Sequence, residues 1–484
     1  MKKWISLTLS TLFLLTPTTV FANSAQTHFR GITPTDVMVT GAKYPLVVHQ
    51  SPVVVEHETL TFDLQEFPLE HYAEEADYLA YSGKVTAEYT FHNPADYDVT
   101  AKLAFPFGQT PDYGYFFNPD TDKRVYAPDA EKYDVLVDGK PIKSTVRHTL
   151  FYQGEEFALE KDLPNLIDGY MEDDFWNLDL PVTKYTWQIS GIDEEYDAAR
   201  LGFLVKGGET ERKLMLADQS GANNSEEETL GVTRWVENGD LIEVYVFGKP
   251  LEEELEWFSE NGSEDTPFDY TLTSVGVEKA TYEDFVFADW EENSTVLRHD
   301  WYNAVTQNLK KCEMNFDRDF GIIASFEYGN GLPVDDLLRW YEYEITIPAG
   351  ETITNTVTAP MYPDANVRYE PPIYTYHYLL SPAKTWAEFG ELDIVVNTPY
   401  YMTESGGRFS FEKTETGYQT SYDGLPDGEL EFILSESAKP KAPNRPLNAL
   451  EAGCIAAVAV AVVAGYRKRK TAIRHPVMFC PMGS

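Results

Sequence analysis

Between residues 79 and 149, apolar and polar positions alternate with the period of two that is typical of β-strands. Apolar residues alternate from Val85 to Phe91, the chain turns at Asn93-Pro94, and a second run extends from Val99 to Phe105. Two further short runs surround Asp138-Gly139, a dipeptide that favours a tight hairpin turn. The pattern predicts antiparallel hairpins, and we expect residues 23–155 to form an N-terminal β domain.

The same alternation returns near the C-terminus. Tyr341, Tyr343, Ile345 and Ile347 occupy alternate positions, a Pro-Ala-Gly turn follows, and apolar residues resume at Ile353. Several more short runs follow, separated by Gly and Pro. Short strands with turns of this kind are typical of all-β sandwiches. We therefore expect residues 316–437 to form a C-terminal β-sandwich.

The region between these two segments, residues 156–315, combines strand patterns with one helical pattern. The stretches "RLGFLVKGG", "RKLMLADQ" and "GDLIEVYVFGKPL" predict strands, and the polar "SGANNSEEETLG" is expected to be an exposed loop. Apolar residues at fourfold spacing predict an amphipathic helix over 296–312, with Ser294 or Thr295 as its N-cap. The fold class is thus mainly β, with two β-sandwich-like domains joined by a mixed region.

The first 22 residues have the layout of a secretory signal peptide. Lys2 and Lys3 precede an apolar run from Trp4 to Leu15, and Val20-Phe21-Ala22 suits a signal peptidase. The apolar run is too short for a comfortable membrane span. We expect the mature chain to begin near Asn23.

Residues 452–466 carry no charged side chain and are followed at once by four basic residues. At about 1.5 Å per residue the run covers only ~22 Å, against roughly 30 Å of hydrocarbon. The basic cluster obeys the positive-inside rule, and the Pro-rich residues 438–451 suit a stalk. We expect a transmembrane helix at 452–466 and a cytoplasmic tail at 467–484. Sortase attachment is the alternative, although the Leu-Pro-x-Thr-Gly pentapeptide is missing.

Two resemblances accompany these patterns. The Asn-Pro turn, the returning strand that reaches a Phe-Pro-Phe, and the "VLVDGKPI" stretch together resemble the VIT domain over residues 81–151. That resemblance implies a β-sandwich interaction module rather than an enzyme. The stretches "IPAGETITNTVTAP", "YHYLLSPAKTWAEFG" and "VVNTPYYMTES" resemble a group of uncharacterised exported surface proteins of Gram-positive, Clostridia-type bacteria, which implies a cell-surface setting.

The charge and cysteine content of the chain exclude some classes of binding partner. The formal net charge of −41 repels nucleic acid and anionic lipid head groups. Cys312 is the one cysteine in the expected exported region, while Cys454 and Cys480 lie in the anchor and the tail. An exported chain of this size without an internal disulfide suits a bacterial surface, and whether Cys480 is lipidated stays open. Cell-wall polymers, glycans and extracellular proteins are the partner classes that remain.

Two motifs resemble a catalytic motif and a metal-binding motif, but each has a simpler structural interpretation. Ser381 and Lys384 match the S-x-x-K of penicillin-recognising enzymes, but S-D-N and K-T-G partners are missing. We expect Ser381 to cap a short helical turn that has Pro382 at its first position and Gly390 just past its end. Residues 118–129 have oxygen ligands at some positions of a Ca²⁺ loop but lack its glycine, so a solvated loop is expected. The sequence predicts no catalytic, metal or cofactor-binding residues.

One acidic cluster supports an alternative. Glu172, Asp173 and Asp174 precede Trp176, and paired carboxylates beside an aromatic ring suit a glycosidase. With 79 acidic residues in the chain, such neighbours also arise by chance. We therefore expect a non-enzymatic binding or structural module on the cell surface, with a surface carbohydrate hydrolase as the alternative. A sensor that signals through its tail is a weaker third hypothesis.

Overall fold

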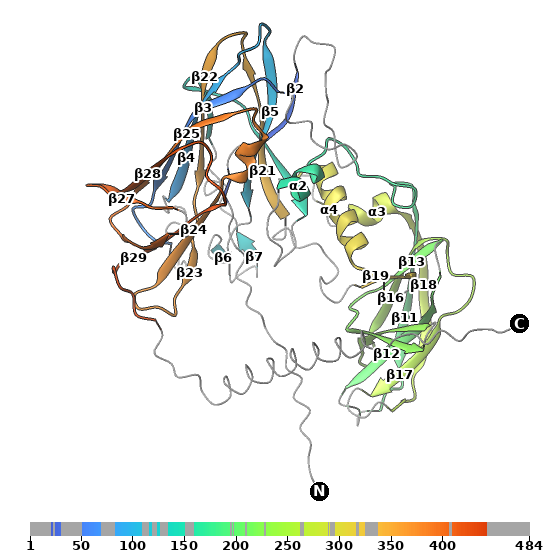
Figure 1. The fold of residues 1–484 in the computed structure, drawn as a ribbon. Coiled ribbons are helices and arrows are strands. Elements are labelled where there is room, and N and C mark those ends of the chain that lie inside the picture. The colour runs from blue at the N-terminus through green and yellow to red at the C-terminus, as the bar shows by residue number, and fades with distance from the viewer. Residues whose placement is uncertain are drawn as a thin grey trace, which may run out of the picture.

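The structure is a computed structural model, and the chain is mainly β, as its sequence pattern predicts (Figure 1). The residues that it describes are 21–22, 25–30, 51–68, 83–108, 116–118, 123–125, 134–150, 159–193, 196, 198–208, 211–226, 229–261, 266–288, 290, 296–315, 319–324, 337–405 and 409–442. Figure 1 shows two β units with helices between them.

The first unit is built on an eight-stranded sheet that mixes early and late parts of the chain. Its order is β27 (Glu412–Lys413), β28 (Gly417–Asp423), β25 (Phe389–Asn397), β3 (Val54–Asp63), β4 (Lys84–His92), β22 (Thr352–Pro360), β8 (Asp134–Val137) and β9 (Lys140–Pro141). The alternation expected in β4 is present, because Val85, Ala87, Tyr89 and Phe91 are all buried. The turn after β8 has positive φ at both Asp138 and Gly139, as a tight hairpin requires.

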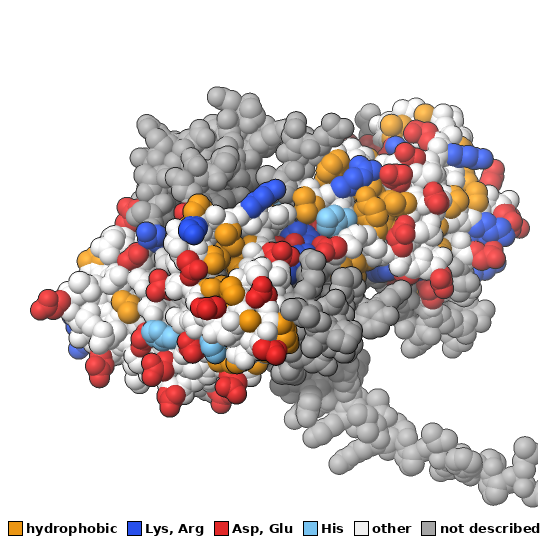
Figure 2. Space-filling model, turned by 90° about the horizontal axis from the view of Figure 1, so that it is seen from above, with side chains coloured by type: hydrophobic (Ala, Val, Ile, Leu, Met, Phe, Trp, Pro, Cys, Tyr) orange, Lys and Arg blue, Asp and Glu red, His pale blue; other side chains and the backbone are white. Residues whose placement is uncertain are grey.

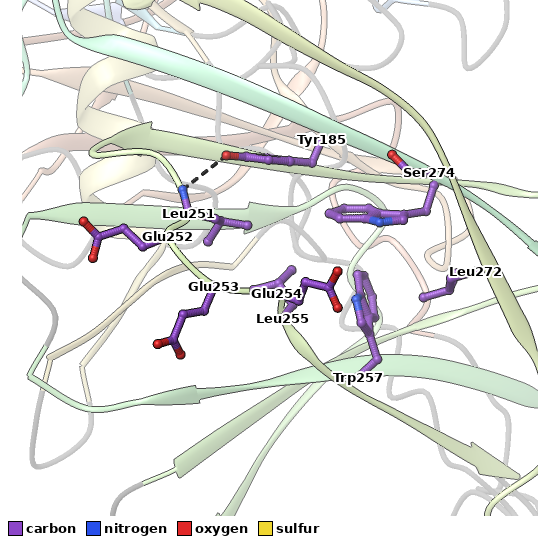
Figure 3. A pocket seen from close by; sticks show the side chains of 10 residues that line it. Tyr185, Leu251, Glu252, Glu253, Glu254, Leu255, Trp257, Leu272 and Ser274 are labelled. Atoms are coloured by element: carbon purple, nitrogen blue, oxygen red, sulfur yellow. Dashed lines mark hydrogen bonds between the residues drawn. The ribbon is translucent and has the colours of Figure 1, made fainter.

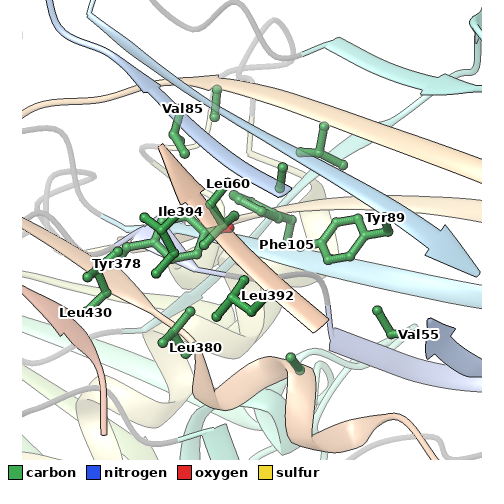
Figure 4. Close-up of a cluster of buried hydrophobic side chains, with 14 of the residues drawn as sticks. Val55, Leu60, Val85, Tyr89, Phe105, Tyr378, Leu380, Leu392, Ile394 and Leu430 are labelled. Carbon is green, nitrogen blue, oxygen red and sulfur yellow. The ribbon is translucent and has the colours of Figure 1, made fainter. Parts of the chain in front are cut away.

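Two further sheets complete this unit. One has the order β10 (Thr145–Leu150), β21 (Leu337–Ile347), β5 (Val99–Gly108) and β2 (Ala25–Arg30). The other has the order β1 (Phe21–Ala22), β24 (Ile373–Leu379), β29 (Leu430–Ser435) and β26 (Tyr401–Ser405), with β23 (Asp364–Asn366) paired to β24. Side chains of all three sheets share one core, to which Leu60 of β3, Phe105 of β5 and Tyr378 of β24 contribute (Figure 4). In this core Phe62 packs edge-on against Tyr378 and Phe432.

This arrangement differs from the expected division into an N-terminal and a C-terminal domain. β3 and β4 belong to the segment 23–155, yet they pair with β25 and β22 of the segment 316–437. The alternation of apolar residues fixes which face of a strand is buried but does not name its partner strand. The two segments therefore form one unit with one core.

The middle of the chain forms a second β unit. A six-stranded sheet has the order β18 (Thr271–Thr281), β11 (Pro181–Ser190), β16 (Leu241–Gly248), β13 (Arg212–Leu216), β20 (Asp319–Ile323) and β19 (Glu313–Asn315). A four-stranded sheet has the order β14 (Gly221–Glu226), β15 (Thr229–Trp235), β12 (Ala199–Lys206) and β17 (Glu256–Asn261). A core of side chains from both sheets lies between them. The short strands β6 (Phe116–Asn118) and β7 (Lys123–Val125) pair separately.

The named helices are α2 (Leu159–Asp162), α3 (Tyr282–Val286) and α4 (Arg298–Lys311), with short 3-10 helices at Leu163–Asn165 and Ser381–Thr385. Helix α4 confirms the helix expected over 296–312, and it buries Trp301 and Leu309. Its N-cap is Leu297, which makes no side-chain cap, rather than Ser294 or Thr295. Helices α3 and α4 pack with Val182 and Phe247 on the outer face of the six-stranded sheet.

Two local expectations were wrong. The polar stretch expected as a loop forms the hairpin of β14 and β15, because β15 contributes the buried Leu230 and Val232 to the core. Helix α3 was not expected, although Thr281 and Asp284 form a capping box at its start. Among the described residues, no helix is long and apolar enough to cross a membrane. The expected signal peptide, apart from Phe21–Ala22, and the stretch 452–466 lie outside them.

Candidate functional site

A groove with a volume of about 490 Å³ opens at the edge of the second β unit (Figure 3). Five of its lining residues come from three strands: Tyr185 and Trp187 from β11, Trp257 from β17, and Leu272 and Ser274 from β18. The aromatic and leucine side chains are only half-buried and pack against the core between the two sheets. The groove is therefore an opening at the side of that core.

The remaining wall is the segment from Leu251 to Leu255, which connects β16 with β17. The backbone N–H of Leu251 donates to the Tyr185 hydroxyl at 3.2 Å, which ties this segment to β11. Lys249 forms ion pairs with Glu211 at 3.2 Å and Glu252 at 3.0 Å. The segment is held at its start, and its three consecutive glutamates line one side of the groove, with the Glu252 carboxylate paired to Lys249.

The aromatic rings form a corner. The rings of Tyr185 and Trp187 have centroids 5.9 Å apart and lie nearly parallel, with an interplanar angle of 14°. The Trp257 ring stands at 73° to that of Trp187, with 5.2 Å between centroids. Trp257 is fixed from behind by Phe203, whose ring packs edge-on against it at 5.4 Å. A flat ligand group can thus meet two differently oriented ring surfaces.

Several polar groups of the groove have no hydrogen-bond or ion-pair partner within the described part of the chain. In the described part of the chain, no hydrogen bond or ion pair is formed by the side chains of Glu254, Ser274 or Trp257. Figure 3 shows the Glu254 carboxylate beside the Trp257 ring, while the carboxylates of Glu252 and Glu253 point away from it. The groove thus combines ring surfaces with an unpaired carboxylate, a hydroxyl and an indole N–H, which is the mixture typical of small-molecule sites.

In the acidic cluster expected as an alternative active site, Asp173 and Trp176 have structural roles. Trp176 is only 2% exposed and packs against Phe247 and Tyr282, so its ring has no surface for a sugar. The Asp173 carboxylate accepts hydrogen bonds from the backbone of Trp176 and Phe175 and pairs with Lys310 at 2.6 Å. Partial burial acts to raise the pKa of Asp173, but these donors outweigh it and hold the pKa below its usual value.

The S-x-x-K motif lies in the 3-10 helix Ser381–Thr385. Contrary to expectation, Ser381 does not cap this turn with its side chain. The N-cap is Leu380, and Glu429 accepts hydrogen bonds from the backbone N–H of Leu380 and Ser381. Gly390 lies within β25 rather than just past the turn. The motif forms a local structural turn.

A serine, an aspartate and a histidine meet on the exposed face of the eight-stranded sheet. Asp393 on β25 receives a hydrogen bond from Ser421 at 2.5 Å and lies 2.9 Å from the Nε2 of His57 on β3. In a nucleophilic triad the histidine stands between serine and carboxylate, whereas here the carboxylate stands between the other two. The three residues form a cross-strand contact in which the serine hydroxyl donates to the carboxylate and not to the histidine.

A buried ionic cluster joins α4 to the first β unit. Arg147 on β10 donates to Asp300 on α4 from its Nε at 3.0 Å and from its Nη2 at 3.0 Å, and both side chains are 2% exposed. Arg147 also pairs with Glu342 at 2.9 Å and with Asp168 at 3.0 Å. Burial acts to lower the pKa of Arg147, but the carboxylates, above all Asp300, outweigh it and raise the pKa. This cluster is a structural junction, since its charges satisfy one another.

The paired evidence for a metal site is a candidate Ca²⁺ loop in the sequence and the positions of potential ligand side chains in the described residues. Most of the candidate Ca²⁺ loop at 118–129 lies outside the described residues, which include only its Asn118 and Lys123–Val125. Within the described ranges, no three His, Cys, Asp or Glu side chains gather as a metal site would require. The Cys312 thiol is half-buried and donates to Asn308 Oδ1 at 3.8 Å, and Cys454 and Cys480 lie outside the described residues.

The sequence contained a signal for the groove that its motifs did not reveal. Tyr185 and Trp187 are separated by one residue, so a strand places both on one face. The stretch "LEEELEW" then brings four acidic residues close to Trp257, and the first three of them line the groove. Their meeting depends on the pairing of distant strands, which the sequence pattern does not specify.

Comparisons with known proteins supply no family for this chain. No protein-family model matches it, and no curated protein matches it. Among solved structures, the crystal structure of a putative nutrient binding protein from Legionella pneumophila is similar, with a TM-score of 0.32 and 9% identity, and the likeness covers 86% of this chain and 72% of that one. A likeness at this TM-score carries no argument about fold or ligand. The groove must be interpreted from its own chemistry.

Proposed function

We propose that this chain is a bacterial cell-surface protein that binds a ligand without transforming it, with the groove of β11, β17 and β18 as its binding site. The observation that carries the proposal is the aromatic corner beside unpaired polar groups. Binding sites characteristically combine apolar and aromatic surface with a few oriented polar groups. These features support a binding function at this groove.

The cell-surface setting rests on the two ends of the sequence. The signal-peptide pattern of residues 1–22 favours export, and the apolar run at 452–466 with its basic flank favours a single-pass anchor. The large part between them would then be extracellular. Deletion of residues 452–466 should release the protein from cells into the medium; retention of the deleted form in the membrane fraction would contradict the anchor.

The hydrolase alternative loses the observation that motivated it. It required a tryptophan surface for a sugar beside acidic residues, and Trp176 is buried while Asp173 is paired with Lys310. The VIT-like resemblance, which implies an interaction module, agrees with binding rather than hydrolysis. We therefore keep binding as the function that the residues support best.

Binding can be tested with the full-length chain in non-ionic detergent. Tryptophan fluorescence would be followed against wall-polymer fragments, glycans, short peptides and small organic ions, and each ligand would be recovered and checked for chemical change. We expect at least one ligand to bind and to be recovered intact. Trp257→Ala should abolish that binding, while Trp235→Ala, which removes an exposed tryptophan on β15, should not. Binding that survives Trp257→Ala, or none to any class, would overturn the proposal.

A further inference from the structure

We infer that the groove takes a small organic cation whose ammonium group carries methyl groups. The inference rests on the proposed function, since it names the ligand class for the same groove. It follows from three properties of the described lining residues: their charge, their ring surfaces and the volume they enclose.

The charge of the lining is one-sided. Glu252, Glu253 and Glu254 contribute carboxylates, and the ten lining residues include no Lys, Arg or His. The basic residue beside the segment, Lys249, is already shared between Glu211 and Glu252. The carboxylate nearest the rings, Glu254, has no partner among the described residues (Figure 3). A cation would supply the missing charge.

The molecule as a whole strengthens this preference. Its formal net charge is −41, and acidic side chains are spread over both halves of the face in Figure 2. A surface potential of one sign raises the local concentration of small ions of the opposite sign. An anionic ligand would be repelled both by the whole surface and by the three glutamates of the groove.

The rings favour a weakly hydrated cation over a simple ammonium. Tryptophan faces attract cations electrostatically, and quaternary ammonium groups are recognised by aromatic surfaces in this way. Trp187 and Trp257 meet at 73°, so methyl groups can contact both indoles while the positive charge stays near Glu254. Leu251, Leu255 and Leu272 add apolar surface for those methyl groups.

The volume favours a small molecule over a protein. About 490 Å³ lies within the range of roughly 300–1,000 Å³ for small-molecule pockets. A stable protein partner typically buries about 800 Å² on each side, which a groove lined by ten residues does not provide. We therefore assign the groove to a soluble organic cation.

Choline and its neutral carbon isostere, 3,3-dimethylbutan-1-ol, form a matched pair of probes for the full-length chain. Titration calorimetry should show that choline binds and that the isostere binds at least about tenfold more weakly, because the shapes agree and only the charge differs. Equal binding of the two would overturn the inference. Raising the salt concentration should weaken choline binding, since half-exposed charges are screened.

Substitutions of single glutamates test which carboxylate attracts choline. Glu254→Gln keeps the side-chain size and should weaken choline binding by about fivefold. Glu256→Gln removes an exposed carboxylate on β17 that does not line the groove, so it should change choline binding by less than about twofold and serves as the control. Equal effects of the two variants would contradict the assignment. If choline fails but a glycan binds in a way that Trp257→Ala abolishes, the cation inference falls while the proposed function stands. If nothing binds, both fall.

Discussion

Arg147 and Asp300 show how single residues hold distant parts of the chain together. Both side chains are 2% exposed, and they are 153 residues apart in the sequence. Asp300 also accepts a hydrogen bond from the backbone N–H of His148 at 2.9 Å. Removing one member of a buried pair leaves the other charge without compensation, which costs far more than losing an exposed pair.

Asp300→Ala should therefore lower the free energy of unfolding by about 3 kcal/mol. Glu342 and Asp168 remain beside Arg147 and keep the loss from being larger. Urea denaturation would measure the change. The control is Lys249→Ala, which removes the exposed ion pairs with Glu211 and Glu252 and should lower the free energy of unfolding much less. If both variants lost the same free energy of unfolding, the buried cluster would contribute no more to stability than the exposed ion pairs.

His148, also in this junction, should make stability depend on pH. Burial lowers its pKa most, and the positive charges of Arg339 and Arg147 lower it further, to about 3. The unfolded chain therefore takes up a proton near pH 6.5 that the folded chain refuses until about pH 3. The stability from neutral His148 is complete above pH 6.5 and is lost as pH falls through that window.

His148→Gln should flatten this dependence. Between pH 6.5 and 4.5 the free energy of unfolding of the wild type should fall more steeply than that of the variant, by at most about 1.4 kcal/mol per pH unit. Urea denaturation at pH 7, 6 and 5 would give both slopes. Equal slopes in the wild type and the variant would contradict the neutral, buried state of His148.

At the scale of single elements, strands with strict alternation could be predicted from the sequence. In β4 and β22 every second residue is buried, so the apolar period was sufficient. The hairpin of β14 and β15 was not predicted from the sequence. Its first strand, "GANNSE", is polar and forms a strand because it pairs with β15. Helix α3 was not predicted because it has only five residues, which are too few to show the period of a helix.

The start of α3 offers a test at this scale. Thr281 Oγ1 accepts from the backbone N–H of Asp284 at 3.2 Å, and the Asp284 carboxylate accepts from the backbone N–H of Thr281 at 2.9 Å. Thr281→Ala removes the first of these bonds and should cost about 1 kcal/mol of stability in thermal or urea unfolding. Thr273→Ala on the exposed face of β18 should change stability by less than about 0.5 kcal/mol. No difference between the two would contradict the capping role.

At the scale of the whole molecule, the pairing of remote segments could not be predicted. β4 and β22 are more than 250 residues apart, and β25 lies parallel to β3 across an even longer separation. Alternation in each strand is compatible with many partners, so the sequence suggested two separate sandwiches where the structure has one shared core. The groove was missed for the same reason, since its walls come from three strands and a connecting segment.

The shared core predicts how the chain can be divided. A fragment of residues 23–158 lacks β22 and β25, so it should show no cooperative thermal unfolding by circular dichroism. The fragment 325–442 should fail in the same way, because it lacks β3, β4 and β5. Expressed together, the two fragments should associate and unfold cooperatively. The reference is the intact chain, in which residues 159–324 connect them. Cooperative unfolding of either fragment alone would contradict the single core.

The central claim is that ligand is bound in the groove of the second β unit. Hydrogen–deuterium exchange of the full-length chain, with and without a ligand from the binding screen, tests it most directly. The account predicts slower exchange at residues 251–257 on ligand binding, with β4 and β22 unchanged. Protection of residues 172–178 around Trp176, or of the first β unit, with no change at 251–257 would contradict it.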